Sequence, residues 1–136
     1  MADDLDVKVV GLGAALELAI CVPPAVLVSW LRQDDIGAES NLWLVAAFLV
    51  LVLAPAAAGV LVSRRRPDTP LLHSALAAAA AWSVLAGLSV VRAAASGTDV
   101  AGLLATLLTV APIQVGFGVL GAFFFNPPRR PEEIDP

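Results

Sequence analysis

Four long apolar stretches, separated by short polar links, constrain the fold of this chain more than any other feature. They run over residues 9–31, 42–63, 71–91 and 100–125. Each exceeds the roughly 18 apolar residues that mark a helix able to cross a bilayer. The only ionisable side chains within them are Glu17, Cys21 and His73. The sequence therefore predicts an all-α protein, a bundle of four transmembrane helices in which sequential helices are antiparallel, because short links join neighbours.

Composition and the lengths of the other segments argue against a soluble domain. Hydrophobic residues make up 59% of the 136 residues and charged residues 15%, with a mean hydropathy of +0.86. Soluble domains carry about 25% charged residues. The tails, 1–8 and 126–136, and the links are too short to fold as separate domains. We expect one transmembrane domain over 9–125, with a cytoplasmic tail before it and a disordered cytoplasmic tail after it.

The distribution of basic residues predicts which side of the membrane holds the termini. Four spans place both tails on one side, together with the link between the second and third helices. The other side holds only Arg32 and Arg92, and the remaining six of the eight basic residues lie with the tails: Lys8, Arg64, Arg65, Arg66, Arg129 and Arg130. Because cytoplasmic segments are enriched in Lys and Arg, both termini are predicted to be cytoplasmic. The three consecutive arginines are also candidate contacts for anionic lipid headgroups, although their role in orientation explains them equally well.

Glu17 is the strongest functional candidate because it lies near the middle of the first helix. At about 1.5 Å per residue it is roughly 12 Å from Val9, at a depth where an isolated carboxylate is costly and burial favours the neutral acid. Counting back from Phe125 places Gln114 about 16 Å deep, near the same level. Glu17 and Gln114 could therefore form a hydrogen bond across the first and fourth helices.

His73 lies about 3 Å below the cytoplasmic surface by the same count. One hypothesis is a polar track of Glu17, Gln114 and His73 that opens to the cytoplasm, with Glu17 as a proton carrier or cation site. The alternatives are a protonated Glu17 that serves only helix packing and an ordinary interfacial histidine.

Small residues predict where helices approach closely. In the third helix Ala75, Ala79, Ser83 and Gly87 recur every four residues and form a stripe that favours contact with another helix, from this chain or from a second copy. Gly118 is the corresponding small residue in the fourth helix. The segment 116–121 matches the dinucleotide fingerprint G-x-G-x-x-G, but it lies inside an apolar helix with no preceding strand, so close packing explains its glycines.

Proline residues within three of the apolar stretches predict kinks. Pro23 and Pro24 interrupt the first helix, Pro55 the second and Pro112 the fourth. A proline has no backbone N–H, so Pro55 frees the carbonyl of Leu51 from the helical hydrogen-bond pattern. Neighbouring helices or polar groups are expected to take up the freed carbonyls.

The residues needed for most enzyme chemistry are missing from the sequence. With one His and one Cys, the chain has no metal-spaced ligands, no hydrolase triad and no haem or iron–sulfur site. We therefore expect no metal, no cofactor and no enzyme activity. The arginine cluster is too small, and too poor in aromatic residues, for nucleic-acid binding.

Residues 58–76 read Ala-Gly-Val-Leu-Val-Ser-Arg-Arg-Arg-Pro-Asp-Thr-Pro-Leu-Leu-His-Ser-Ala-Leu, a small-residue helix end, a basic turn and a helix that opens around His. This segment resembles a family of small uncharacterised four-helix bacterial membrane proteins. Ser74 stands where that family usually has Gly, and the alanines at 56–58 replace part of its glycine run. The resemblance implies a multi-pass protein of the bacterial cytoplasmic membrane with no known activity.

A second resemblance, in layout, is to the small multidrug transporters, which carry an essential Glu in the first of four helices and a Trp in the third. Glu17 and Trp82 fall in the corresponding helices, but the arginine-rich link and the prolines after Glu17 depart from that pattern. Two functional hypotheses follow. One is a structural or accessory membrane protein that partners lipid and either a second copy or a larger complex. The other is a proton-coupled transporter or channel centred on Glu17.

Overall fold

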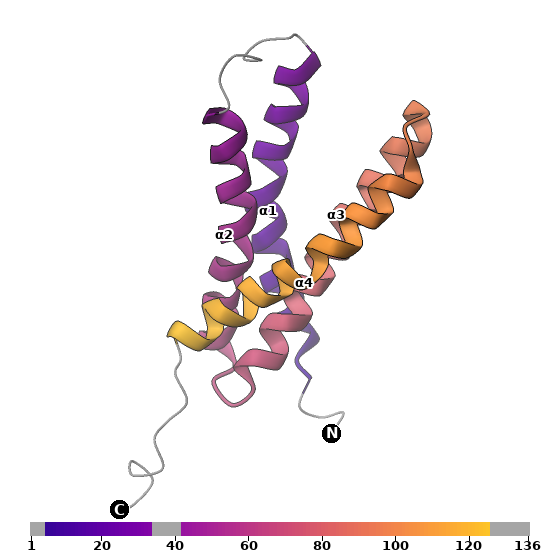
Figure 1. Cartoon of the computed structure of the whole chain (residues 1–136). Helices are drawn as coiled ribbons and strands as arrows, with labels where there is room; N and C mark the ends of the chain where they lie inside the picture. Colours follow the sequence, from indigo (N-terminus) through magenta and orange to yellow (C-terminus); the bar gives the residue numbers. More distant parts are fainter. Residues whose placement is uncertain (1–4, 34–41, 126–136) are drawn as a thin grey trace, which may run out of the picture.

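The computed structural model describes residues 5–33 and 42–125, and within these ranges the chain forms four α-helices (Figure 1). The helices are α1 (Val7–Gln33), α2 (Leu42–Arg65), α3 (Pro70–Ser96) and α4 (Val100–Phe125). All four are long and apolar enough to cross a membrane. The prediction of an all-α protein with four candidate spans is confirmed. The predicted disorder after residue 125 lies outside the described residues.

The start of α1 differs from the sequence prediction because Asp6 caps the helix. Its Oδ1 accepts hydrogen bonds from the backbone N–H groups of Lys8, at 3.0 Å, and Val9, at 3.2 Å. These are orphan donors that a helix N-terminus leaves without an internal partner, and Asp is among the side chains best suited to accept from them. The helix thus begins at Val7, and the last residues of the predicted 1–8 tail belong to the bundle.

The junction between α3 and α4 is built from a glycine and an aspartate. Gly97 adopts a left-handed conformation, with φ 69° and ψ 20°, and its N–H donates to the carbonyl of Ala93. This geometry ends α3, and glycine adopts it at little cost. Asp99 then caps α4 by accepting from the N–H groups of Ala101, at 3.0 Å, and Gly102, at 3.2 Å.

The helices pack around a central pair. α2 and α3 contact each other, and both α1 and α4 pack against this pair. In the described part of the chain, no Cα atom of α1 lies within 8 Å of one in α4. The backbones of α1 and α4 are therefore not adjacent. Order along the chain does not fix which helices touch, and here α2 and α3 separate the other two.

Glycines allow α2 and α4 to approach backbone to backbone. A Cβ at Gly59 would collide with the carbonyl oxygen of Gly118, and one at Gly121 would collide with the carbonyl of Ala56. The fingerprint-like glycines at 118 and 121 are thus packing residues, while a Cβ at Gly116 would meet nothing within 4 Å. The sequence prediction that close packing explains the motif holds for two of its three glycines.

Most buried side chains lie toward one end of the bundle. We call this end the base; it comprises the start of α1, the link 66–69 and the start of α3. Away from the base, the buried positions extend as far as Cys21, Ala54, Ala81 and Gln114, and beyond them Ala93 is the one buried residue among the side chains described. Figure 1 shows the α1–α2 pair and the α3–α4 pair diverging toward that far end.

The predicted stripe on α3 is largely uncovered within the chain. Ala75 and Ala79 are half-buried, Ser83 and Gly87 are exposed, and a Cβ at Gly87 would meet nothing within 4 Å. The face of α3 that is buried instead carries His73, Ser74, Ala77, Ala78 and Ala81. The sequence left two partners open for this stripe, another helix of this chain or a helix of a second copy. The helices of this chain do not cover Ser83 and Gly87.

Candidate functional site

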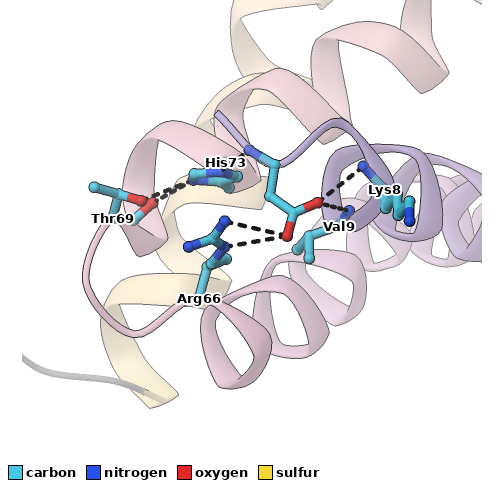
Figure 2. A network of polar contacts seen from close by, with 6 residues as sticks. Lys8, Val9, Arg66, Thr69 and His73 are labelled. Atoms are coloured by element: carbon cyan, nitrogen blue, oxygen red, sulfur yellow. Dashed lines mark hydrogen bonds and ion pairs between the residues drawn. The ribbon is translucent and has the colours of Figure 1, made fainter. Parts of the chain in front are cut away.

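His73 lies at the centre of a polar cluster at the base (Figure 2). Its side chain is 0% exposed. Nε2 accepts a hydrogen bond from the Asp6 N–H at 2.9 Å, and Nδ1 lies 3.0 Å from both the carbonyl oxygen and the hydroxyl oxygen of Thr69. Because Asp6 supplies the donor, Nε2 carries no proton, and the ring proton is assigned to Nδ1, which donates to Thr69. His73 is thus a buried histidine whose two ring nitrogens both have partners within the chain.

Asp6 connects three elements through this cluster. Its Oδ1 caps α1, and its backbone N–H donates to His73. Its Oδ2 accepts from Arg66, directly after α2, with distances of 3.3 Å to Nε and 3.2 Å to Nη2. The hydrogen bond from the Val9 N–H, together with the Arg66 guanidinium and the Lys8 N–H, holds the pKa of Asp6 below its ordinary value of 3.8. The start of α1, the end of α2 and the start of α3 are thus joined.

Asp6 and Thr69 are polar residues that the sequence analysis did not single out. An Asp just before an apolar run is a signal for a helix cap, and a Thr followed by Pro70 is a signal for a helix start. Those signals locate the helix ends. They do not show that His73 contacts Asp6, because the two residues are far apart in the sequence and meet only when α1 packs against α3.

The arginine cluster divides into two parts. Arg64 and Arg65 are exposed, whereas Arg66 is half-buried and paired with Asp6. Arg66 is therefore engaged within the chain, and lipid contact at Arg64 and Arg65 stays a prediction.

Glu17 lies in the core, with 1% of its surface exposed, and neither carboxyl oxygen has a hydrogen-bond partner. Its level in the bundle follows from Gly13, one turn nearer the base. A Cβ at Gly13 would lie 2.5 Å from Val62 Cγ2 and 2.9 Å from Ala77 Cβ, so α1 contacts both central helices there. One turn farther, Glu17 is level with about Ala58 on α2 and Ala81 on α3.

Gln114 enters the core from the other side of the central pair. It is 6% exposed, and its Oε1 has no hydrogen-bond partner. A Cβ at Gly118, one turn away on α4, would lie 2.9 Å from Ala78 Cβ. Because α4 runs opposite to α3, Gln114 is level with about Ala81. Glu17 and Gln114 thus lie at about the same level along the central pair, on opposite sides of α2 and α3.

The predicted polar track does not form. No hydrogen bond joins Glu17, Gln114 and His73 in the described part of the chain. His73 is satisfied by Asp6 and Thr69 at the base, and the Glu17 and Gln114 oxygens are unpartnered deeper in the bundle. The expected Glu17–Gln114 hydrogen bond is absent because the central helices hold α1 and α4 apart.

Two further features bear on chemistry. An open apolar groove of about 350 Å³ lies between the start of α1 and one face of α3, and its lining includes Val10, Ala79 and Ser83 but not Glu17. Among the described residues, no group of three or more His, Cys, Asp or Glu side chains is placed to hold a metal ion.

Comparison with known proteins does not place the chain in a family. No protein family, no curated protein and no solved structure matches it. The resemblance drawn from residues 58–76 therefore stays a prediction. The chain differs from that family at Ser74, where the family usually has Gly. Ser74 Oγ donates to the Gly59 carbonyl at 3.3 Å, so α2 and α3 lie close there even with Ser.

Proposed function

We propose that the protein is a multi-pass membrane protein with a structural or accessory role and no enzyme activity of its own. The observation that supports this proposal is the enclosure of Glu17, which is 1% exposed and level with alanines on both neighbouring helices. A carboxyl that handles a solute needs a wet cavity, since ligand sites are concave and reachable. A carboxyl enclosed by small apolar side chains fits a role in the packed core better.

Reconstitution into liposomes tests this role most directly. We expect no solute-driven proton flux from the wild-type protein or from Glu17→Gln, measured with a pH-sensitive dye trapped inside the vesicles. Flux in the wild type that disappears in Glu17→Gln would overturn the structural role.

The proposed location is the bacterial cytoplasmic membrane, with both termini in the cytoplasm, because six of the eight basic residues lie on the side of the termini. Cysteine labelling in a Cys21→Ser background tests it, since Cys21 is the single native cysteine. Ser96→Cys should react with an impermeant maleimide in intact cells, and Asp68→Cys only after permeabilisation. The reverse pattern would place the termini outside.

The proposed partners are lipid and a second copy or a larger membrane complex, with no nucleic acid. Exposed Ser83 and Gly87 leave room for a helix from another chain, and exposed Arg64 and Arg65 suit anionic headgroups. Gly87→Cys in the Cys21→Ser background should cross-link between copies in membranes. Leu88→Cys, about 100° around the helix, is the matched control. Equal cross-linking at both positions would argue against a specific interface.

A second candidate function is a proton-coupled transporter or channel centred on Glu17. It is favoured by one observation, the absence of a hydrogen-bond partner for either carboxyl oxygen of Glu17. Buried polar groups in a membrane protein are costly without partners and usually serve function. The liposome measurement decides between the two candidates, and Gln114→Leu adds a second variant that should reduce flux if the amide takes part.

A further inference from the structure

His73 is held at the base by one acceptor contact and one donor contact (Figure 2). Its Nε2 accepts from the Asp6 N–H at 2.9 Å, and its Nδ1 lies 3.0 Å from both oxygens of Thr69. A backbone N–H can only donate, so this arrangement requires the neutral ring with its proton on Nδ1. The side chain is 0% exposed, so both partners come from the chain rather than from solvent.

The contact with Asp6 depends on the charge of the ring. An imidazolium carries an N–H at both nitrogens and has no acceptor. A proton added at Nε2 points at the Asp6 N–H, and two donors that face each other at 2.9 Å repel. The contact with Thr69 does not conflict in this way, because Nδ1 donates to the carbonyl oxygen in both charge states. Protonation therefore breaks the contact with α1 and keeps the one at the start of α3.

The Asp6 carboxylate is already engaged with other donors. Its Oδ2 pairs with the Arg66 guanidinium at 3.2 Å, and its Oδ1 accepts from the N–H groups of Lys8 and Val9. A turn of this carboxylate toward a charged His73 ring gives up the cap of α1 or the ion pair with Arg66. Loss of the N–H contact and a turn of the carboxylate therefore have the same consequence, a looser start of α1.

The other ionisable groups around the base do not hold a charged ring in place. Arg66 is half-buried and positive, and the remaining ones at the base are exposed: Lys8, Arg64, Arg65 and Asp68. α4 contains no ionisable side chain, and α3 contains only Arg92 besides His73. Glu17, on α1, lies about two turns farther along the bundle, level with about Ala81. Among the described residues, Asp6 is thus the one anion at the base that is not exposed.

From this geometry we propose that His73 is a proton-sensitive latch, which ties the start of α1 to α3 when the ring is neutral and releases it when the ring takes up a proton. Histidine commonly changes its charge between pH 5 and pH 8. Leu5, directly before the released N–H, lines the apolar groove together with Leu76 and Ala79 of α3. Release of the latch lets Leu5 move away from α3, so the groove widens. The latch acts on the conformation of the base and is compatible with either function proposed above.

Nuclear magnetic resonance of the full chain in lipid nanodiscs, titrated from pH 8 to pH 5, tests the latch. His73 is the single histidine of the chain, so the shifts of its labelled ring nitrogens report its protonation without overlap. The Leu5–Asp6 pair is the single Leu-Asp sequence, so a carbonyl label on Leu and an amide label on Asp identify the Asp6 N–H. We expect both ring nitrogens to become protonated and the Asp6 amide to lose about fivefold of its protection from solvent exchange or more, with one common midpoint.

Two variants separate the ring from the neighbouring carboxylate. His73→Gln offers a side-chain oxygen to the Asp6 N–H and does not ionise, so protection of the Asp6 amide should be nearly constant over this pH range. Asp6→Asn keeps the backbone N–H and a side chain that caps helices, so its amide should respond as in the wild type. Moreover, the pKa of Asp6 is held below its ordinary value of 3.8, outside this range.

Four outcomes would overturn the latch. They are a ring that keeps a single proton down to pH 5, a charged ring with the Asp6 amide still protected, the same loss of protection in His73→Gln, and a response that disappears in Asp6→Asn. If His73→Gln does not fold, agreement between the two midpoints within the wild-type chain decides the matter. Separate midpoints would mean that the ring does not control the contact.

Discussion

Buried polar side chains have hydrogen-bond partners at the base of the bundle, whereas buried polar oxygens in its middle have none. At the base, His73 is fully buried, and both of its ring nitrogens have partners from the same chain. In the middle, Glu17 and Gln114 are almost as buried, and none of their oxygens has a partner. Burial alone therefore does not show whether a polar side chain is satisfied within the chain. Its hydrogen-bond partners do, and only the base supplies them.

The two regions also differ in what surrounds them. The base joins α1, α2 and α3 through charged and hydrogen-bonding groups near the end of the bundle, whereas the middle is packed with alanine. A polar cluster that is satisfied internally should cost stability when it is cut. Unpartnered oxygens should cost little when they are removed, because no interaction within the chain is lost.

The largest effect should follow from His73→Phe. This change leaves the Asp6 N–H without its acceptor and removes the contact with Thr69, so we expect a loss of about 3 kcal/mol in the free energy of unfolding. Chemical denaturation in mild detergent, followed by tryptophan fluorescence, measures it. Leu72→Phe, at an exposed neighbouring position on α3, should change stability by less than about 0.5 kcal/mol. A loss below about 1 kcal/mol for His73→Phe would mean that the base cluster contributes little.

A smaller effect, about 2 kcal/mol, is expected from Gly59→Ala. The added Cβ would collide with the carbonyl oxygen of Gly118 on α4. Overpacking of this kind typically costs about 1–3 kcal/mol. Gly87→Ala is the matched control, since the same methyl group enters open space there and improves helix propensity. We expect Gly87→Ala to be neutral or slightly stabilising in the same denaturation assay. Equal losses at both positions would argue against the close α2–α4 contact.

The sequence was sufficient for the four helices, because length and hydropathy determine them. It was not sufficient for helix neighbours. A direct contact between α1 and α4 looked natural from matching depths, but Gly59 and Gly121 bring α4 against α2 instead. The partners of His73 were missed for a related reason, since Asp6 becomes its neighbour only through the packing of α1 on α3.

A pH effect of smaller size is expected from Asp6. Its folded-state pKa is lowered, so the unfolded chain takes up a proton first as the pH falls. The stabilisation is complete above the ordinary value of 3.8 and is lost as the pH falls from there through the folded-state pKa. Unfolding free energies between pH 6 and pH 2.5 should show this slope in the wild type and not in Asp6→Asn. Arg66→Met should reduce the slope without removing it, because the hydrogen bond from Val9 remains.

The smallest effect is expected from Glu17→Leu. Leu fills a similar volume and removes two oxygens that have no partner, so stability should stay within about 1 kcal/mol of the wild type or rise. Denaturation in the same detergent assay gives this value, and the loss for His73→Phe measured beside it is the reference. If Glu17→Leu costs as much as His73→Phe, Glu17 has a partner within the folded chain. The contrast between the two regions would then be wrong, and Glu17 would be a second packing residue.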